Sequence, residues 1–263
     1  MRVVVIIPTY NEKENIGRML EVMQDLVAGE KDDYQILIVD DNSPDGTAEI
    51  VKNFMNKHKN VFLTSGRKEG LGVAMIRGIK YGINKLRADV IVSNEADFAF
   101  DPKHIPFMVG KIKEGYDVVV GSRHVGVGKT KGWTAARKIN HWMANKLFAT
   151  WVAGVTEVYD HNGAFRAIRV ANVADKIDLN KLKTKGFGFF NYYLFKLTEV
   201  TDKFYEFPVT YKFRISGESK VSFNPRYFGT YLRDVFEYII LAFKIRLKKL
   251  TIDSRRPRNS LRG

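Results

Sequence analysis

The chain carries VVVIIPTYNE at residues 3–12 and QILIVDDNSPDGT at residues 35–47, two β-branched runs that each end in a cluster of polar residues. A short apolar run bounded by turn residues is typical of a buried strand. A helical pattern over Asn11–Val27 separates the two runs. Strands that alternate with helices predict a parallel sheet with crossover helices, so these stretches predict an α/β fold.

The alternation continues through the first half of the chain. Strands are predicted at Val3–Ile7, Gln35–Val39, Val61–Thr64, Val90–Ser93 and Asp117–Gly121, and helices at Asn11–Val27, Thr47–Lys57, Leu71–Leu86 and His104–Lys113. Sheets of this Rossmann-like kind, mostly parallel and flanked by helices, bind ligands beyond the carboxyl ends of their strands. The polar residues after each strand are therefore the candidate site.

The amino-acid composition excludes cysteine chemistry and indicates an anionic binding partner. The chain has no cysteine, which excludes disulfides, thiolate metal sites and cysteine nucleophiles. Its net charge of +14 indicates an anionic partner: nucleic acid, a phosphorylated substrate or acidic lipid. Much of this excess lies in residues 244–263, and RNP, KH and zinc signatures are absent, so we expect no nucleic-acid partner.

The C-terminal region is predicted to be an amphipathic helix with a basic tail over residues 229–263, after a catalytic domain over residues 1–228. One interpretation is a core helix with a solvated end. The other is an interfacial helix drawn to an anionic membrane surface. We see no secretory signal and no apolar stretch of the roughly 20 residues that cross a bilayer, so we expect a cytoplasmic, peripheral protein.

Acidic residues follow two of the predicted strands. Glu95 and Asp97 lie one residue apart and can chelate a hard divalent cation, although two solvated turn acids have the same spacing. The adjacent carboxylates of Asp40 and Asp41 repel one another unless they bind a base, a ribose or a metal-bound group. Asp45 is interpreted as a helix cap.

Five motifs together resemble the family 2 glycosyltransferases, in particular the polyprenyl-phosphate sugar synthases of the dolichyl-phosphate mannose synthase type. They are PTYNE (8–12), VDDNSPDGT (39–47), KEGLG (68–72), GSR (121–123) and GESK (217–220). The resemblance extends from Val3 to about Val221. It implies a GT-A fold that binds a nucleotide-sugar donor with Mg²⁺ or Mn²⁺ and transfers the sugar, with inversion, to a polyprenyl phosphate acceptor. GDP-mannose is the donor we expect.

The resemblance also implies roles for individual positions. The residues that would bind the nucleoside are Pro8, Tyr10, Glu12, Asp40 and Asp41; those that would bind the metal are Glu95 and Asp97; those that would bind the phosphates are Gly72, Arg123, Arg137, Arg214, Ser219 and Lys220. Asp97 and Arg214 are the residues assigned to catalysis. A departing nucleoside diphosphate needs its charge neutralised, whereas an acceptor phosphate is already anionic and needs no catalytic base.

Two other functions stay open. Glu95 stands where the family usually has Asp, and Ala99 where it often has a polar metal-binding residue, which allows a degenerate homologue that binds nucleotide sugars without turnover. A saccharide or other hydroxyl acceptor is the second alternative, and it requires a general base. A membrane-bound acceptor also makes a small membrane protein a possible partner.

The histidines and tryptophans are given structural interpretations. His104, His124, His141 and His161 show no pair at metal-ligand spacing and are interpreted as structural or surface residues. The tryptophans Trp133, Trp142 and Trp151 and the aromatic cluster at residues 187–195 are interpreted first as packing residues.

Overall fold

The computed structural model describes residues 1–130, 135–182, 186, 188–212 and 225–255. Three predicted phosphate ligands, Arg214, Ser219 and Lys220, lie outside the described residues, as does Trp133. The elements are β1 (Arg2–Thr9), α1 (Lys13–Val27), β2 (Asp33–Asp40), α2 (Thr47–Lys57), β3 (Val61–Ser65), α3 (Leu71–Asn84), β4 (Val90–Ser93), η1 (Pro102–His104), α4 (Ile105–Lys113), β5 (Val118–Ser122), β6 (Lys129–Thr130), α5 (Ala135–Trp142), the π-helix η2 (Met143–Val152), β7 (Arg166–Arg169), η3 (Ala174–Lys176), η4 (Leu179–Lys181), α6 (Gly188–Thr198), β8 (Phe204–Pro208), β9 (Thr210–Tyr211) and α7 (Pro225–Arg255). Every strand and helix predicted in the first half of the chain is present.

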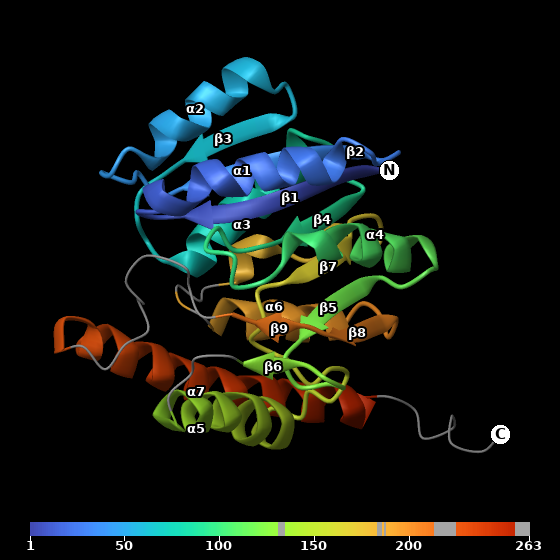
Figure 1. Ribbon diagram of the computed structural model, residues 1–263. Helices are drawn as coiled ribbons and strands as arrows, with labels where there is room; N and C mark the ends of the chain where they lie inside the picture. The colour runs from blue at the N-terminus through green and yellow to red at the C-terminus, as the bar shows by residue number, and fades with distance from the viewer. Residues whose placement is uncertain (131–134, 183–185, 187, 213–224, 256–263) are drawn as a thin grey trace.

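A seven-stranded sheet in the order β3-β2-β1-β4-β7-β5-β8 forms the centre of the molecule (Figure 1). Only β7 is antiparallel to its neighbours, β4 and β5. The mostly parallel α/β fold is thereby confirmed. The register pairs Thr9 with Asp40 and Asp40 with Ser65, so the carboxyl ends of β1, β2 and β3 meet at one edge.

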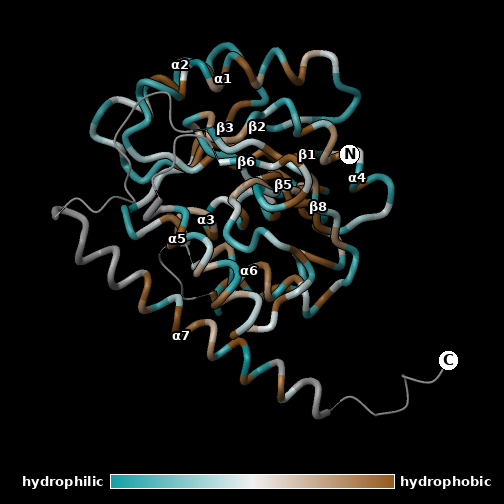
Figure 2. Tube along the Cα trace, turned by 60° about the horizontal axis from the view of Figure 1, so that its bottom comes forward, coloured by the Kyte–Doolittle hydropathy of each residue, from teal (hydrophilic) through white to brown (hydrophobic). Residues whose placement is uncertain are grey.

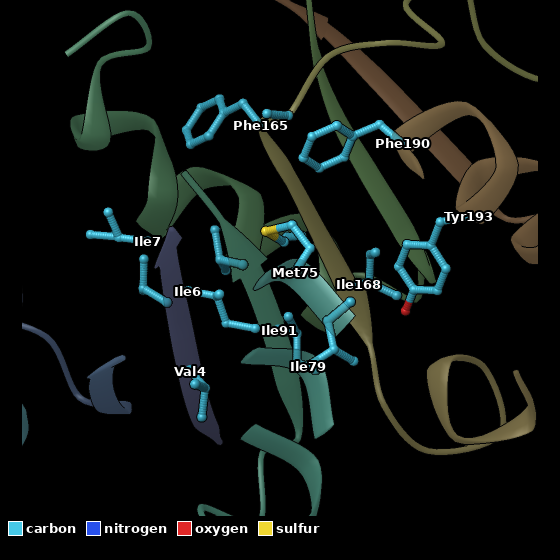
Figure 3. Close-up of a cluster of buried hydrophobic side chains, with 14 of the residues drawn as sticks. Val4, Ile6, Ile7, Met75, Ile79, Ile91, Phe165, Ile168, Phe190 and Tyr193 are labelled. Carbon is cyan, nitrogen blue, oxygen red and sulfur yellow. The ribbon is translucent and has the colours of Figure 1, made fainter. Parts of the chain in front are cut away.

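The central strands are apolar on both faces because helices cover both faces of the sheet. The side chains of residues 3–7, 36–39 and 90–92 are buried. Figure 3 shows part of this core, in which Met75 and Ile79 of α3 lie against Ile6 and Ile91 of the sheet. Residues of β7 and α6, such as Ile168 and Tyr193, extend the same cluster.

A glycine allows α3 to lie directly on the sheet. A Cβ atom at Gly78 would lie 2.7 Å from Ile6 Cγ2 and 2.9 Å from Val39 Cγ2, distances at which the helix would have to shift. The close approach has a functional consequence, because it places the neighbouring Arg77 beside Asp41 at the end of β2.

The long helix α7 packs against α6 and η2 (Figure 1). Its Tyr238 hydroxyl donates to Ala144 O and accepts from Asn191 Nδ2, both at 3.0 Å. One face of the helix is buried through Leu241, Ala242 and Ile245, and the opposite face exposes Phe236, Ile240, Phe243, Leu247 and Leu250. Among the described residues, no helix has the length and hydropathy to cross a bilayer.

The structure confirms the predicted packing role for some aromatic residues and contradicts it for others. Phe189, Phe190 and Phe195 are buried, which confirms the packing role of the cluster on α6. The packing interpretation is wrong for Trp142 and Trp151, whose exposed fractions are 50% and 64%. These two rings form a T-shaped pair with centroids 6.1 Å apart. Aromatic spacing along a helix shows which residues share a face, but not whether that face is covered.

Candidate functional site

The two acids at the end of β2 are held by different partners. Asp40 is fully buried and accepts hydrogen bonds from Thr9 Oγ1 at 3.0 Å and from Ser43 N at 2.8 Å. Asp41 accepts from Arg77 Nη2 at 2.5 Å. The guanidinium offsets the repulsion between the adjacent carboxylates, a partner that the linear sequence did not reveal. Asp45 was interpreted as the helix cap, but the N-cap of α2 is Gly46. Asp45 immediately precedes it and accepts from the Thr47 N–H at the start of α2.

The segment after β1 lies beside these acids. Glu12 is buried, accepts from Asn15 Nδ2 at 2.8 Å, and its backbone N–H donates to Thr47 Oγ1. Lys68 Nζ lies 3.5 Å from the centre of the Tyr10 ring, a cation–π contact that joins the loops after β1 and β3. The remaining predicted residues at this edge are Pro8, half-buried in β1, and Gly72, buried at the start of α3.

The turn after β4 carries the predicted metal ligands. Asp97 is 3% exposed and accepts from the Ala99 N–H at 3.1 Å, while Glu95 is half-buried. Beside them, both side-chain polar atoms of Asn94 are buried and have no hydrogen-bond partner among the described residues. An unsatisfied buried amide is costly, which makes Asn94 a further candidate for the site. Ala99 is fully buried and offers no polar side chain.

Arg123 follows β5 and forms a bidentate, buried ion pair with Asp160. Its Nε and Nη2 each donate to one oxygen of the carboxylate at 2.7 Å, and its backbone N–H donates to Asp160 Oδ2 at 3.1 Å. Both side chains are buried. The charge of Glu95 also acts on Arg123, so the guanidinium is electrostatically linked to the acidic turn after β4.

The environment fixes the charge states around this pair. Burial alone would raise the pKa of Asp160, but the charge and hydrogen bonds of Arg123 outweigh it and hold that pKa well below its usual range. Burial raises the pKa of Glu206, whose two oxygens accept from the Tyr159 and Asp160 N–H groups. Arg166 is buried and donates to the carbonyls of Phe190 and His161, and burial lowers its pKa to about 10.

Beside Arg123 lies a cavity of about 410 Å³ with a basic lining. It is lined by Arg123, His124, Gly128, Lys129, Thr130, Lys138, His141 and Trp142. His124 is exposed and His141 is half-buried, so both have the structural or surface environment that was predicted. Their pairing was not predicted: the rings stack with centroids 4.9 Å apart and the Nε2 atoms lie 2.9 Å apart. No sequence pattern indicates this pair, since 17 positions separate the two histidines.

The other histidines have structural environments, as predicted. His161 is buried, its Nε2 lies 2.8 Å from Val155 O, and burial lowers its pKa to about 4. His104 packs edge-on against Phe207. Arg137 lies in α5, and its side chain is outside the described part of the chain.

The model of one protein family, glycosyl transferase family 2, matches residues 4–175. This match covers more than half of the chain and includes β1, β2, the turn after β4 and Arg123. The chain belongs to glycosyltransferase family 2. The resemblance seen in the sequence motifs is confirmed.

Three curated relatives cover most of the chain. An undecaprenyl-phosphate mannosyltransferase of Micrococcus luteus is 35% identical over 84% of this chain and 88% of its own. A dolichol-phosphate mannosyltransferase of Pyrococcus furiosus is 32% identical over 90% of this chain, which spans 63% of that protein. A polyprenol monophosphomannose synthase of Mycolicibacterium smegmatis is 31% identical over 84% of this chain and 81% of its own.

Solved structures confirm the GT-A fold of this glycosyltransferase. The mannosyl-3-phosphoglycerate synthase of Rubrobacter xylanophilus aligns with a TM-score of 0.63 at 17% identity, covering 100% of this chain and 77% of its own. The glucosyl-3-phosphoglycerate synthase of Mycobacterium tuberculosis, in complex with Mn²⁺, UDP and glucosyl-3-phosphoglycerate, aligns with a TM-score of 0.62 at 16% identity, covering 92% and 80%. At these identities the likeness concerns the fold.

Proposed function

We propose that this glycosyltransferase moves mannose from GDP-mannose to a polyprenyl phosphate with inversion at the anomeric carbon. The observation that carries the proposal is the juxtaposition of an acidic turn with a basic cavity, joined by Arg123. The three curated relatives are named as mannosyltransferases or a monophosphomannose synthase acting on undecaprenyl, dolichol or polyprenol phosphates. That agreement supports the acceptor class and the sugar.

The donor would lie over the carboxyl ends of β1, β2 and β4. Asp40 is buried at this edge and Asp41 lies beside it, which suits recognition of the base and ribose. Tyr10, Glu12 and Pro8 would complete the nucleoside site, and Gly72 at the start of α3 would approach the phosphates through its backbone.

The residues of the acidic turn fit a divalent cation. Glu95 and Asp97 would hold Mg²⁺ or Mn²⁺ through carboxylate oxygens, the donors that these hard cations prefer. The buried side chain of Asn94 supplies a further oxygen without a described partner. When bound, the metal would offset the charge of the leaving nucleoside diphosphate. A structural relative crystallised with Mn²⁺ and UDP supports this assignment.

The acceptor phosphate would bind in the basic cavity, with Arg123 between it and the donor. In the proposed reaction an acceptor phosphate oxygen forms a bond to the anomeric carbon, and the bond from that carbon to the nucleotide diphosphate oxygen breaks. Because the attacking oxygen is already anionic, the step needs no general base. Arg137, Arg214, Ser219 and Lys220 are proposed as additional phosphate ligands, with Arg214 and Asp97 as the catalytic residues.

The experiment compares wild type with Asp97→Asn and Glu95→Gln in the transfer of labelled mannose from GDP-mannose to a polyprenyl phosphate in detergent. Wild type should be active with Mg²⁺ or Mn²⁺ and inactive with EDTA, and both variants should lose the metal-dependent rate while remaining folded. Asp101→Asn, in the neighbouring loop, is the control. Wild-type rates in both variants would contradict the metal assignment. Nucleotide-sugar binding by wild type without any turnover would indicate a degenerate homologue.

We also propose that the protein docks on the cytosolic face of a membrane through α7 and the helix formed by α5 and η2. The two neighbouring segments expose Ile139, Trp142, Met143, Trp151, Phe236, Ile240, Phe243, Leu247 and Leu250. Figure 2 shows apolar and polar positions alternating along α7. Exposed Lys244 and Arg246 add positive charge beside this face, so anionic lipid is the partner we propose.

Co-sedimentation with phosphatidylglycerol-containing liposomes tests the docking surface. The double substitution Phe243→Ser with Leu247→Ser should weaken binding, as should deletion of residues 244–263. High salt should weaken binding of wild type because it screens the basic residues. Phe107→Ser, at an exposed site on α4, is the control and should bind like wild type. Unchanged binding by both altered proteins would contradict the docking proposal. A small membrane protein would then be the alternative route to the acceptor.

A further inference from the structure

The stacked histidines in the cavity wall form an ionisable pair. His124 follows Arg123 at the end of β5, and His141 lies in α5. Their Nε2 atoms are 2.9 Å apart and their ring planes differ by 13°. At that distance two ring nitrogens share one hydrogen, so that one imidazole donates and the other accepts. The pair therefore has at least one nitrogen that carries no proton.

The cavity that these rings face is suited to an anion. Among the described residues, its lining includes Arg123, Lys129 and Lys138 and no carboxylate. Asp160 acts on His124, but both of its oxygens accept from Arg123. The turn in the cavity wall requires a glycine, because a Cβ atom at Gly128 would lie 2.7 Å from Ser122 O. This compact turn lets backbone line the space between the basic side chains.

We propose that His124 and His141 bind the acceptor phosphate as a protonated pair, so that binding of the acceptor takes up a proton. The identity of the anion rests on the proposed function, whereas the proton coupling does not. Uptake of one proton makes one ring an imidazolium and lets both Nε2 atoms carry a hydrogen. Without an anion, these two N–H groups would repel one another and the imidazolium would repel Arg123. A phosphate dianion removes this repulsion, since each Nε2–H can then donate to a phosphate oxygen.

The electrostatic surroundings favour a neutral His124 before binding. Burial lowers the pKa of His124, and the charges of Arg123 and Lys146 lower it further, while Asp160 opposes them. A bound dianion raises that pKa. The affinity for the dianion is therefore highest at pH values below the pKa that the histidine pair has without the anion. It falls as the pH rises from that pKa toward the higher pKa that the pair has with the anion bound. Uptake of one proton corresponds to about a tenfold change in affinity per pH unit.

The same side chains could also be considered as a metal site. The ligand atoms of His124, His141 and Asp160 all lie within 4.8 Å of one another. A dication there would compete with Arg123 for the Asp160 carboxylate and would lie beside Lys129 and Lys138. The charge of the surroundings therefore favours an anion, and Zn²⁺ binding becomes a competing outcome of the test.

Sulfate is the probe for the test because it stays a dianion where a phosphate monoester titrates. Its binding to the full chain, with and without farnesyl phosphate as competitor, is measured by calorimetry between about pH 5.5 and 8.5, a range that spans the ordinary imidazole pKa. The variants are His124→Asn and His141→Asn. His58→Asn is the matched control, since His58 lies at the end of α2 and stacks on Phe54.

For wild type and His58→Asn, we expect the sulfate Kd to rise by up to about tenfold per pH unit over part of this range. The two cavity variants should bind more weakly at low pH and lose this slope. An unchanged slope in both would overturn the proposal, as would stoichiometric Zn²⁺ binding that depends on both histidines and blocks sulfate. Proton-coupled binding without mannose transfer would instead count against the proposed function alone.

Discussion

We expect substitution of either partner of the buried Arg123–Asp160 ion pair to lower the free energy of unfolding strongly. Asp160→Asn keeps the shape of the side chain but removes the charge that balances a buried guanidinium. Removing one partner of a buried ion pair costs about 3–5 kcal/mol, a large part of the stability of a typical domain. At about 2–4 °C per kcal/mol for a chain of this size, the melting temperature should fall by about 6–20 °C.

Thermal and urea unfolding of Asp160→Asn measure this effect. Glu49→Gln is the matched control, because Glu49 and Lys52 form an exposed pair at 3.9 Å that should contribute about 1 kcal/mol or less. The double variant Arg123→Met with Asp160→Leu should be more stable than the sum of its single variants indicates, since it leaves no unpaired buried charge.

The pH dependence gives a second test of the pair. The folded-state pKa of Asp160 is lowered, so its contribution is present above the unfolded-state value of about 3.9 and is lost as pH falls below that value. Wild type should lose more stability than Asp160→Asn on acidification below about pH 4. If Asp160→Asn lowers the free energy of unfolding by less than about 1 kcal/mol at neutral pH, the two buried charges do not stabilise one another and the reasoning is refuted.

Three other substitutions test separate parts of the structure. Because burial lowers the pKa of His161 from 6.5 to about 4, acidification across that interval should cost wild type up to about 3 kcal/mol. His161→Gln should remove that slope from urea-unfolding data, and a retained slope would contradict the assignment. Tyr238→Phe leaves Asn191 Nδ2 and Ala144 O without this hydroxyl and should cost about 1–3 kcal/mol. Hydrogen exchange should show faster exchange in α7, and wild-type protection there would refute its role as an anchor. Arg77→Gln removes the partner of Asp41 and should weaken GDP binding about tenfold. Calorimetry measures the affinity, and a GDP affinity equal to that of wild type would contradict this prediction.

The sequence was sufficient to predict the parallel part of the sheet. Residues 3–7 and 36–39 are continuous apolar runs because both faces of their strands are covered. The antiparallel β7 was not predicted, since Arg166–Arg169 is short and begins and ends with arginine. It forms a strand because β4 and β5 supply partners on both sides, which is information held in the tertiary structure.

The candidate site was predictable where its residues follow strands and hidden where folding brings distant residues together. Asp40, Glu95 and Arg123 could be assigned from their positions at strand ends. The partners Arg77 and Asp160 could not be paired with them from sequence, because each depends on how a helix or loop packs. The stacking of His124 on His141 likewise depends on how α5 packs beside the end of β5, which the sequence pattern does not show.

The central claim is that a phosphate oxygen of a polyprenyl phosphate is the group that receives the sugar. The most direct measurement supplies GDP-mannose and metal with either a polyprenyl phosphate or the corresponding polyprenol, and analyses the lipid product by mass spectrometry. The account predicts a mannosyl-phosphate lipid from the first acceptor and no product from the second. Mannosylation of the polyprenol, or of an added saccharide in preference to the polyprenyl phosphate, would contradict it.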